Sequence, residues 1–405
     1  MANGMDYQVS RYFQTHGFKP RDIEKARIYE FVLSSGGISR KKLSQRLEIR
    51  PNNVSEAVQQ LVDDNLMIEI PDESKGKGRP EILLHARRDR LVSIAVGVSS
   101  DYLTAALIDM AGYSLLEKDV RIPAETDNLS FYERLVALIS EVVARVGRTQ
   151  ILVGIGIAVP GVVSENGGKW VFNSTWPVVS NLDLSRLPSR FHVPVTVFRF
   201  LDAELNALIL KHERLRNASV LLVHWGYGIG ASFCQDGVIP SLRIGSIGEM
   251  GHMKVNASDS TLQCKCGEKG CLETVASGWA LRSRLEPLTG KFPTDEKKLG
   301  RVLEDLDLSS DEAIQRAVAG LAKAIDITYR FYPADKIIIY GPFMANQDIR
   351  IDLVSLVRAK LPWYSKDCVD IEVGLGEDGE ATALGSCAEF FRSRLEKMLV
   401  FRNVI

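Results

Sequence analysis

The sequence predicts an α/β body with mixed sheets, long enough for two lobes, behind a small N-terminal helical module. From Leu91 onwards, apolar stretches typical of strands alternate with helical patterns. Before that point, three helical segments precede two short apolar segments, which is the outline of a winged helix-turn-helix. The chain has 405 residues, enough for two to three domains of ordinary size.

Composition excludes disorder and collagen-like structure, because hydrophobic residues make up 45% and charged residues 25% of the chain. The net charge of −1 gives no overall attraction to nucleic acid or membrane. Residues 1–90, however, carry 16 basic and 13 acidic residues, a net of +3, which leaves −4 for the rest. Affinity for nucleic acid must therefore come from a local patch.

The N-terminal module is expected to hold helices over 21–34 and 40–47 and a third that begins at Pro51. Ser39 is expected to cap the second helix. The third helix buries one face, made of Val54, Ala57, Val58, Leu61 and Val62. Its other face is rich in amides and hydroxyls, which suit phosphates and base edges.

Two short strands over 66–70 and 82–84 flank a basic, glycine-containing loop at 71–80. Glycine lets a cationic loop approach DNA closely, and an arginine can enter a narrow minor groove. The bland alternative is a solvated linker after an ordinary helical bundle. We predict DNA binding by a module over 1–88, with these candidate contacts: Arg40, Asn52, Asn53, Ser55, Gln59, Lys77 and Arg79.

The body alternates between the two patterns. Strands are expected at 91–98, 103–109, 151–159, 195–198, 220–224 and 337–339. Helices are expected at 130–146, between 198 and 220, and after the last strand through 361, and an amphipathic helix is expected at 388–401. The last helix is expected to pack against the body, and no partner is assigned to it.

The N-terminus lacks the apolar core of a secretory signal, and no stretch approaches the ~20 apolar residues that cross a bilayer. We therefore expect a cytoplasmic protein without membrane insertion. The six cysteines are too few for a disulfide scaffold.

Three cysteines lie within eight positions, and a histidine precedes them. Cys264, Cys266 and Cys271 with His252 offer three thiolates and one imidazole, a complete tetrahedral shell for zinc. Because no position is left open for water, we predict a structural zinc site. The alternative is three free thiols and a core histidine.

The run 249–277 resembles the signature of the ROK family of sugar kinases and sugar-responsive transcriptional repressors. That signature is an acidic-x-Gly-His element, a Cys-x-Cys-Gly-x-x-Gly-Cys-Leu-Glu loop and an Ala-Ser pair, here Ala276 and Ser277. Other landmarks that resemble the family are 159–161, Asn173 with Trp176, and 201–203. The added N-terminal module makes the chain similar to the repressor branch, that of the xylose and N-acetylglucosamine repressors.

The resemblance implies an actin/hexokinase-like (ribonuclease H-like) two-lobed body with a sugar in its cleft. The expected domains are the winged helix-turn-helix over 1–88, a small α/β lobe over 89–199 completed by a C-terminal helix over 380–405, and a large α/β lobe over 200–379 with the zinc loop. The resemblance also implies sugar contacts by Asp202, Glu249, His252 and Glu273. Asp202 matches the catalytic base of the kinases.

Departures from the kinase pattern argue against catalysis. The first phosphate loop, Asp-x-Gly-Gly-Thr in the kinases, corresponds to Gly-Val-Ser-Ser-Asp at 97–101, and the adenine-side Gly-Gly-Gly corresponds to Tyr-Gly-Pro at 340–342. The second glycine loop, at 226–230, is partly kept. Phosphoryl transfer depends on positioning and metal-assisted charge stabilisation, so we expect no kinase activity and a vestigial base at Asp202.

We therefore expect a sugar-responsive regulator, most simply a repressor, that binds operator DNA as a homodimer or homotetramer and takes a sugar or sugar phosphate as effector. Two alternatives stay open. Asp202 leaves room for residual ATP-dependent sugar phosphorylation. Leu201, where the family has Asn, leaves room for an unused pocket and control by a protein partner.

Overall fold

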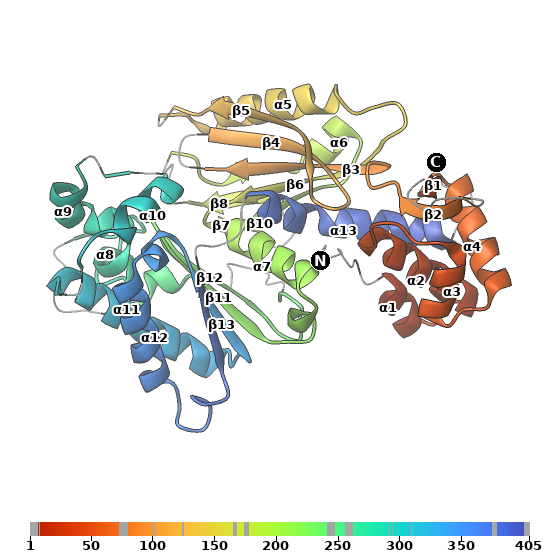
Figure 1. Cartoon of the computed structure of the whole chain (residues 1–405). Helices are drawn as coiled ribbons and strands as arrows, with labels where there is room; N and C mark the ends of the chain where they lie inside the picture. The colour runs from red at the N-terminus through yellow and green to blue at the C-terminus, as the bar shows by residue number, and fades with distance from the viewer. Residues whose placement is uncertain are drawn as a thin grey trace.

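The computed structural model describes residues 7, 9–72, 80–99, 102–123, 125–164, 168–173, 178–240, 248–255, 262–290, 292–293, 295–308, 310–374 and 379–400, without the side chains of 379–382. Its elements form an N-terminal group of helices with a hairpin, and two larger β-sheets with covering helices (Figure 1).

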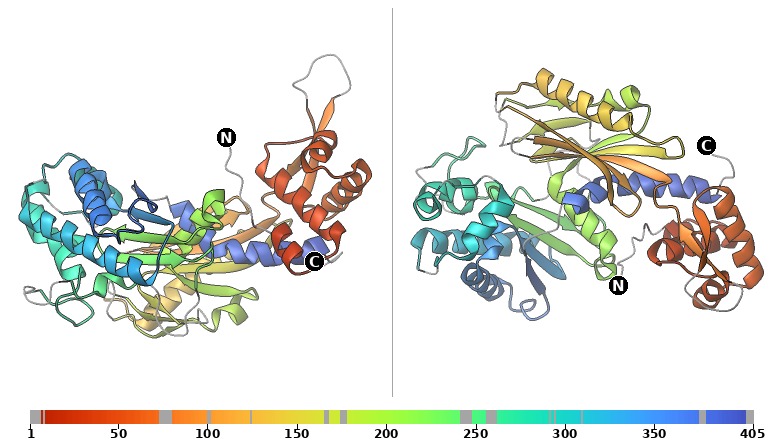
Figure 2. Two further views of the ribbon diagram at one scale, coloured as in Figure 1. Left: turned by 90° about the horizontal axis from the view of Figure 1, so that it is seen from below. Right: turned by 45° about the horizontal axis from the view of Figure 1, so that its top comes forward.

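The N-terminal group contains the predicted helices and strands. Its elements are α1 (Val9–Thr15), α2 (Pro20–Ser34), α3 (Arg40–Leu47), α4 (Pro51–Asp63), β1 (Met67–Asp72) and β2 (Glu81–Ala86). The two strands pair antiparallel, with Met67 opposite Ala86. The hairpin projects from the helices, away from the rest of the chain (Figure 2, left). Helix α1 is an addition that no sequence pattern predicts.

Helix α4 is amphipathic as predicted. Val54, Ala57, Val58 and Leu61 are buried, and Val62 is partly buried. Ser39 occupies the N-cap position of α3, as predicted. Its side chain, however, makes no capping hydrogen bond, and its buried hydroxyl has no partner among the described residues.

The first large sheet has the order β10-β6-β3-β4-β5. Strands β10, β6 and β3 run parallel, whereas β3, β4 and β5 are antiparallel, so the sheet is mixed as predicted. Helix α5 packs against it around buried Phe131, Leu135 and Ile139. The elements are β3 (Leu91–Val98), β4 (Tyr102–Asp109), β5 (Ser114–Arg121), α5 (Asn128–Val143), β6 (Ile151–Val159) and β10 (Val195–Arg199), with the small sheet β7 (Val162–Val163), β8 (Lys169–Phe172), β9 (Leu182–Asp183) and helix α6 (Leu187–Phe191).

The second large sheet has the order β12-β11-β13-β14 and its own hydrophobic core. Strand β12 is antiparallel to β11, and the other pairs are parallel. The elements are η1 (Glu213–Leu215), β11 (Val220–Trp225), β12 (Ile229–Cys234), η2 (Met250–His252), α8 (Glu273–Ala276), α9 (Gly278–Thr289), α10 (Glu296–Glu304), α11 (Glu312–Phe331), β13 (Lys336–Tyr340), η3 (Pro342–Ala345), α12 (Gln347–Lys360) and β14 (Asp370–Gly374).

Helices α7 (Phe200–Lys211) and α13 (Gly379–Val400) lie side by side between the sheets (Figures 1 and 2). The Asn206 side-chain amide donates to the Gly385 carbonyl at 2.8 Å. Helix α13 also lies on β6, where a Cβ on Gly154 would be 2.4 Å from the Phe390 ring. The predicted C-terminal helix therefore begins at 379 rather than 388.

The C-terminal half of α13 packs into the N-terminal group. Phe391, Leu395 and Leu399 belong to the same hydrophobic core as residues of α1, α2 and α4. The rings of Tyr7 and Phe391 are 5.8 Å apart. One continuous core thus joins the N-terminal group, α13 and part of the first sheet.

Within the described part of the chain, no helix has the length and apolar character needed to span a membrane.

Candidate functional site

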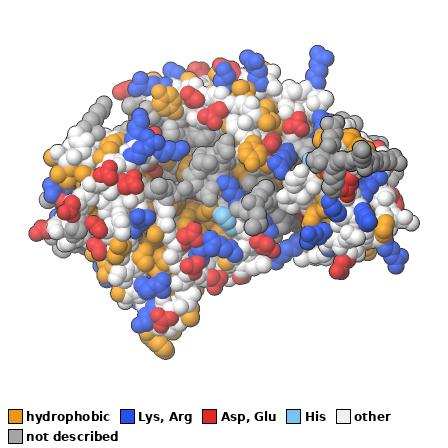
Figure 3. Space-filling view, viewed as in Figure 1, with side chains coloured by type: hydrophobic (Ala, Val, Ile, Leu, Met, Phe, Trp, Pro, Cys, Tyr) orange, Lys and Arg blue, Asp and Glu red, His pale blue; other side chains and the backbone are white. Residues whose placement is uncertain are grey.

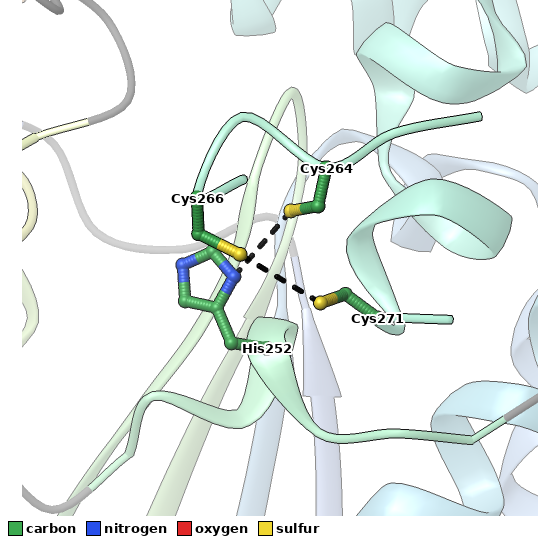
Figure 4. A group of neighbouring side chains, drawn as sticks. All are labelled: His252, Cys264, Cys266 and Cys271. Carbon is green, nitrogen blue, oxygen red and sulfur yellow. Dashed lines mark hydrogen bonds between the residues drawn. The ribbon is translucent and has the colours of Figure 1, made fainter. Parts of the chain in front are cut away.

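Four potential metal ligands converge beside α8. His252 ends η2, and Cys264, Cys266 and Cys271 come from the segment before α8; all four point toward one another (Figure 4). Their ligand atoms lie within 4.8 Å of one another. His252 Nδ1 is 3.5 Å from Cys264 Sγ, and Cys266 Sγ is 3.8 Å from Cys271 Sγ.

The local fold of this segment depends on two glycines. Gly267 (φ 91°) and Gly270 (φ 75°) adopt backbone conformations that other residues rarely adopt. The turn is closed by the Cys264 amide, which donates to the Glu268 carbonyl at 2.8 Å. These tight turns place three sulfurs on one side of a short loop.

The cluster fits a zinc ion. Zinc with Zn–S bonds of about 2.3 Å and a Zn–N bond of about 2.0 Å needs tetrahedral edges of about 3.8 Å between sulfurs and about 3.5 Å between sulfur and nitrogen. The two contacts described above have these lengths. Burial raises the pKa of Cys264 and Cys271, so a cation is needed to stabilise their thiolates at neutral pH.

A second group of polar residues surrounds Arg199, the last residue of β10. Its Nη1 lies 3.1 Å from Asp202 Oδ1, and its Nη2 lies 3.5 Å from Glu249 Oε1. Nη2 also donates to the Ala231 carbonyl of β12 at 3.2 Å. The arginine side chain is only 7% exposed, so little water reaches its positive charge. The Asp202 and Glu249 carboxylates balance that charge.

Asp202 lies in the first turn of α7 and contacts β12 as well. The Ser232 hydroxyl donates to its Oδ1 at 2.6 Å, the same atom that faces Arg199. Burial raises the pKa of Asp202, although Arg199 and the Ser232 hydroxyl oppose that shift. The two donors described for Asp202, Arg199 and Ser232, therefore bind the same carboxylate oxygen, Oδ1.

Glu249 links this group to the metal cluster. Its Oε2 lies 3.8 Å from His252 Nε2, while Nδ1 of the same ring faces the thiols. An ion on Nδ1 would thus leave Nε2 directed toward Glu249, the geometry by which a second shell orients a ligand. Asp202, Glu249 and His252 are brought together as the sequence predicted.

Glu273, the first residue of α8, also joins this group. A Cβ on Gly251, next to His252, would lie 3.0 Å from Glu273 Oε1. The Ile229 amide donates to Oε1 at 2.6 Å, and the Trp279 indole donates to Oε2. Burial raises the pKa of Glu273 against these hydrogen bonds. Both of its oxygens therefore already have protein donors.

The glycine turn between β11 and β12 holds an internal carboxylate. Glu296 Oε1 accepts from the Tyr227 amide at 2.8 Å, and its Oε2 lies 2.8 Å from His224 Nε2. A Cβ on Gly226 would be 2.1 Å from Glu296 Oε1. A larger residue here would have to displace the Glu296 carboxylate and the His224 ring.

The candidate DNA contacts lie on the N-terminal group, and the structure brings only some of them together. Asn52, Asn53, Ser55 and Gln59 are exposed on α4. Asn53 donates to Glu24 at 3.0 Å and Gln59 to Asp63 at 2.9 Å. Lysine and arginine side chains are interspersed with acidic ones on the visible face of this group (Figure 3).

Among the other candidates, only Arg40 lies within the described residues. Arg40 pairs with Glu69 of β1 at 2.9 Å, so it braces the hairpin. Lys77 and Arg79 lie outside the described residues, as does Trp176 among the landmarks. Asn173, another landmark, is buried and donates to the Val179 carbonyl at 2.9 Å.

Sequence reasoning missed several residues of the site, namely Arg199, His224, Ser232, Trp279 and Glu296. His224, Ser232 and Glu296 meet partners 30 or more positions away, which no local spacing reveals. Arg199 and Trp279 lie only three and six positions from Asp202 and Glu273, but these spacings match no motif. A charged residue ending a buried strand three positions before Asp202 was the one available signal for Arg199.

A comparison with family models matches residues 92–386 to the ROK family, more than two thirds of the chain. A putative xylose repressor from Caldicellulosiruptor sp. (strain Rt8B.4) is 29% identical over 318 residues, covering 76% of this chain and 77% of the relative. The DNA-binding transcriptional dual regulator NagC from Escherichia coli K12 is 25% identical over 334 residues, covering 79% and 80%.

Solved structures agree. A ROK family transcriptional regulator, described as a homolog of E. coli MLC protein, superimposes with a TM-score of 0.71 at 25% identity, covering 94% of this chain and 99% of that one. The ROK hexokinase from Thermus thermophilus gives a TM-score of 0.58 at 20% identity over 75% of this chain and 99% of its own, a likeness of fold alone.

Proposed function

The chain belongs to the ROK family, and from that premise we propose that it is a sugar-responsive transcriptional regulator, most simply a repressor. Its body has the mixed α/β, actin/hexokinase-like fold of the family. The observation that carries the proposal is α13, which packs against α7 beside Asp202 at one end and into the core of the N-terminal group at the other. This packing supports a physical connection between the proposed sugar site and the proposed DNA-binding module.

Residues 1–88 are proposed as a winged helix-turn-helix domain. The amphipathic α4 presents exposed Asn52, Asn53, Ser55 and Gln59, and a hairpin follows it, as in modules that insert a helix in the major groove. Arg40 supports the hairpin through Glu69 in this proposal. The loop with Lys77 and Arg79 remains a candidate for phosphate or minor-groove contacts.

The effector site is proposed at Asp202, Glu249, His252 and Glu273. Carboxylates accept charge-assisted hydrogen bonds from sugar hydroxyls. Glu249 lies beside the His252 imidazole, Glu273 lies against Gly251 next to it, and Asp202 is joined to Glu249 through Arg199. The names of the relatives make D-xylose and N-acetyl-D-glucosamine the first sugars to test. Phosphorylated forms belong in the same panel.

A structural zinc ion is proposed on His252, Cys264, Cys266 and Cys271. When bound, the ion supplies a fixed anchor for four side chains and no open coordination position for chemistry. Because it would hold His252 through Nδ1, the orientation of Nε2 toward Glu249 would follow from the metal.

We propose that the body does not transfer phosphate. The Tyr227 amide, which could face a phosphate in a glycine turn, is already used by the Glu296 carboxylate, and that negative charge would repel an anion. Tyr340, which stands where the kinases have the first glycine of the adenine-side segment, donates a hydrogen bond from its hydroxyl to buried Glu204. The kinase alternative is testable by Asp202-dependent phosphorylation of sugars from ATP.

The oligomeric state and the lobe boundaries at 89–199 and 200–379, with a C-terminal helix over 380–405 completing the first lobe, stay part of the proposal. A dimer or tetramer would place two modules on a palindromic operator. Localisation to the cytoplasm follows from that role.

Binding of the purified protein to DNA upstream of its own gene, measured by fluorescence anisotropy with each sugar added, tests the proposal. Specific binding that one sugar shifts several-fold supports it. Specific binding that no sugar shifts favours control by a protein partner, and absence of specific binding contradicts the proposal.

A further inference from the structure

We propose that Arg199 is a positioning residue that clasps the two large sheets together and holds Asp202 and Glu249 in place. The part that concerns sugar binding rests on the function proposed above. The clasp itself does not, because it follows from contacts between described residues.

Arg199 spans the edges of both sheets. Strand β10, which it ends, is the edge strand of the first sheet, and β12 is the edge strand of the second. Arg199 Nη2 reaches the Ala231 carbonyl of β12 at 3.2 Å. The Ala231 amide takes no part in this contact, because it donates to the Gly248 carbonyl at 2.9 Å. One side chain therefore bridges two separately formed sheets.

Gly248 brings Glu249 to the clasp. It has a φ of 110°, and a Cβ there would lie 2.0 Å from the Ala231 carbonyl oxygen. Only glycine lets this segment run so close along β12. The approach places Glu249 Oε1 at 3.5 Å from Arg199 Nη2.

The charges explain why an arginine stands there. Burial raises the pKa of Asp202, and the neighbouring Glu249 carboxylate adds to that rise, whereas the Arg199 guanidinium opposes it. A guanidinium has a planar fork with several N–H donors, so it can serve two carboxylates and a carbonyl at once. Lysine offers one compact charge and would serve them less completely.

The clasp has a consequence for ligand binding. With Arg199 in place, Asp202 and Glu249 are held as acceptors in a fixed orientation, which lowers the cost of ordering them around a ligand. Removing the guanidinium would leave a buried carboxylate without its cation and free the edge of β12 from β10. The site would lose both its charge balance and its geometry.

The first experiment tests the clasp without any ligand. Arg199→Met, Asp202→Asn and the double variant form a cycle measured by thermal unfolding. Arg199→Met is expected to lower the unfolding midpoint by at least about 5 °C, and Asp202→Asn is expected to restore half or more of that loss. The control cycle uses Arg282→Met and Glu286→Gln, an exposed pair at 3.3 Å on α9, where little coupling is expected. Additive effects at Arg199 and Asp202 would overturn the clasp.

The second experiment tests positioning. Calorimetric titration with D-xylose, N-acetyl-D-glucosamine and their phosphates identifies a sugar bound by the unaltered protein. We expect Arg199→Met to weaken that binding at least about tenfold and Arg199→Lys to recover part of it. Equal affinity in Arg199→Met would overturn positioning. If the unaltered protein binds no sugar, the proposed function fails instead, and the unfolding cycle still decides whether the clasp exists.

Discussion

Gly385 of α13 lies directly against the backbone of Ala203 on α7, so closely that a Cβ on the glycine would be 1.7 Å from the Ala203 carbonyl oxygen. Ala203 follows Asp202, and the far half of α13 packs into the N-terminal core. The contact is therefore the point where the proposed sugar site meets the helix that leads to the proposed DNA-binding module.

Gly385→Ala is expected to lower the free energy of unfolding by about 1–3 kcal/mol, because the added methyl group forces two packed helices apart. Gly300→Ala in α10 is the matched control. A Cβ there meets only ordinary contacts of 3.6 Å or more, so the substitution should be neutral or stabilising. Similar changes in both variants, measured by denaturant unfolding, would contradict the close approach of α7 and α13.

Cys266→Ser is expected to remove one zinc ion per chain, because a three-ligand site holds the metal far less tightly. Elemental analysis of the purified protein measures the loss. Cys368→Ser is the control, since that cysteine is exposed and lies outside the His252 cluster. Zinc content that is unchanged in Cys266→Ser would refute the metal assignment.

Stability is expected to fall as pH rises above about 6.5. Burial alone would lower the pKa of His224, but the Glu296 carboxylate, together with Glu204 and Glu273, outweighs burial and raises it. A raised folded-state pKa stabilises the protein below the unfolded value of about 6.5, and this contribution is lost as pH rises through the folded value.

The same pair behaves oppositely at acid pH. His224 and its hydrogen bond lower the pKa of Glu296 against burial, so the contribution of that carboxylate is present above its ordinary pKa and lost as pH falls through the folded value. Unfolding midpoints between pH 4 and 9 measure both limbs of the stability curve, namely the alkaline fall that His224 causes and the acid fall that Glu296 causes. The alkaline limb should disappear in His224→Gln and persist in His192→Asn, an exposed position with a φ of 56° that Asn tolerates. A limb that survives in His224→Gln would assign it to another group.

Arg79→Ala is expected to weaken DNA binding and reduce by about one the slope of log affinity against log salt, as expected for one lost phosphate contact. Arg330→Ala, on α11 and paired with Asp326, is the control with the same change of charge. Anisotropy titrations at several salt concentrations give the slopes. An unaltered slope in Arg79→Ala would show that this loop stays clear of DNA.

Local patterns predicted the hairpin and the strands β3, β4, β6, β10, β11 and β13, but they missed β5, β12 and β14 and the helices α8 to α11. Helix α3 and strand β6 have the predicted ends, because each is bounded by clear signals and carries a strong periodicity. The amphipathic pattern at 388–401 missed the first half of α13, whereas the resemblance implied a helix from 380. Gly385 weakens helix propensity, and the close contacts with α7 and β6 that outweigh this are tertiary.

The metal ligands were predictable because their chemistry is concentrated in a short segment. Arg199 and Glu296 were not, since Arg199 reaches Glu249 and Glu296 reaches Tyr227, each 50 or more positions away and brought near only by the folded chain. Glu273 shows a different limit of sequence-based prediction. Its place was predicted, but its two protein donors, Ile229 and Trp279, were visible only in the structure.

The most direct test of the proposed regulator is reciprocity between sugar and DNA. The affinity for operator DNA is measured with and without saturating sugar, and the affinity for that sugar with and without operator. If one coupling joins the two sites, both ratios must be equal, and a factor of about 5–150 is typical of allosteric proteins. We predict equal ratios different from one. Ratios of one in both directions, with both ligands bound, would contradict the account.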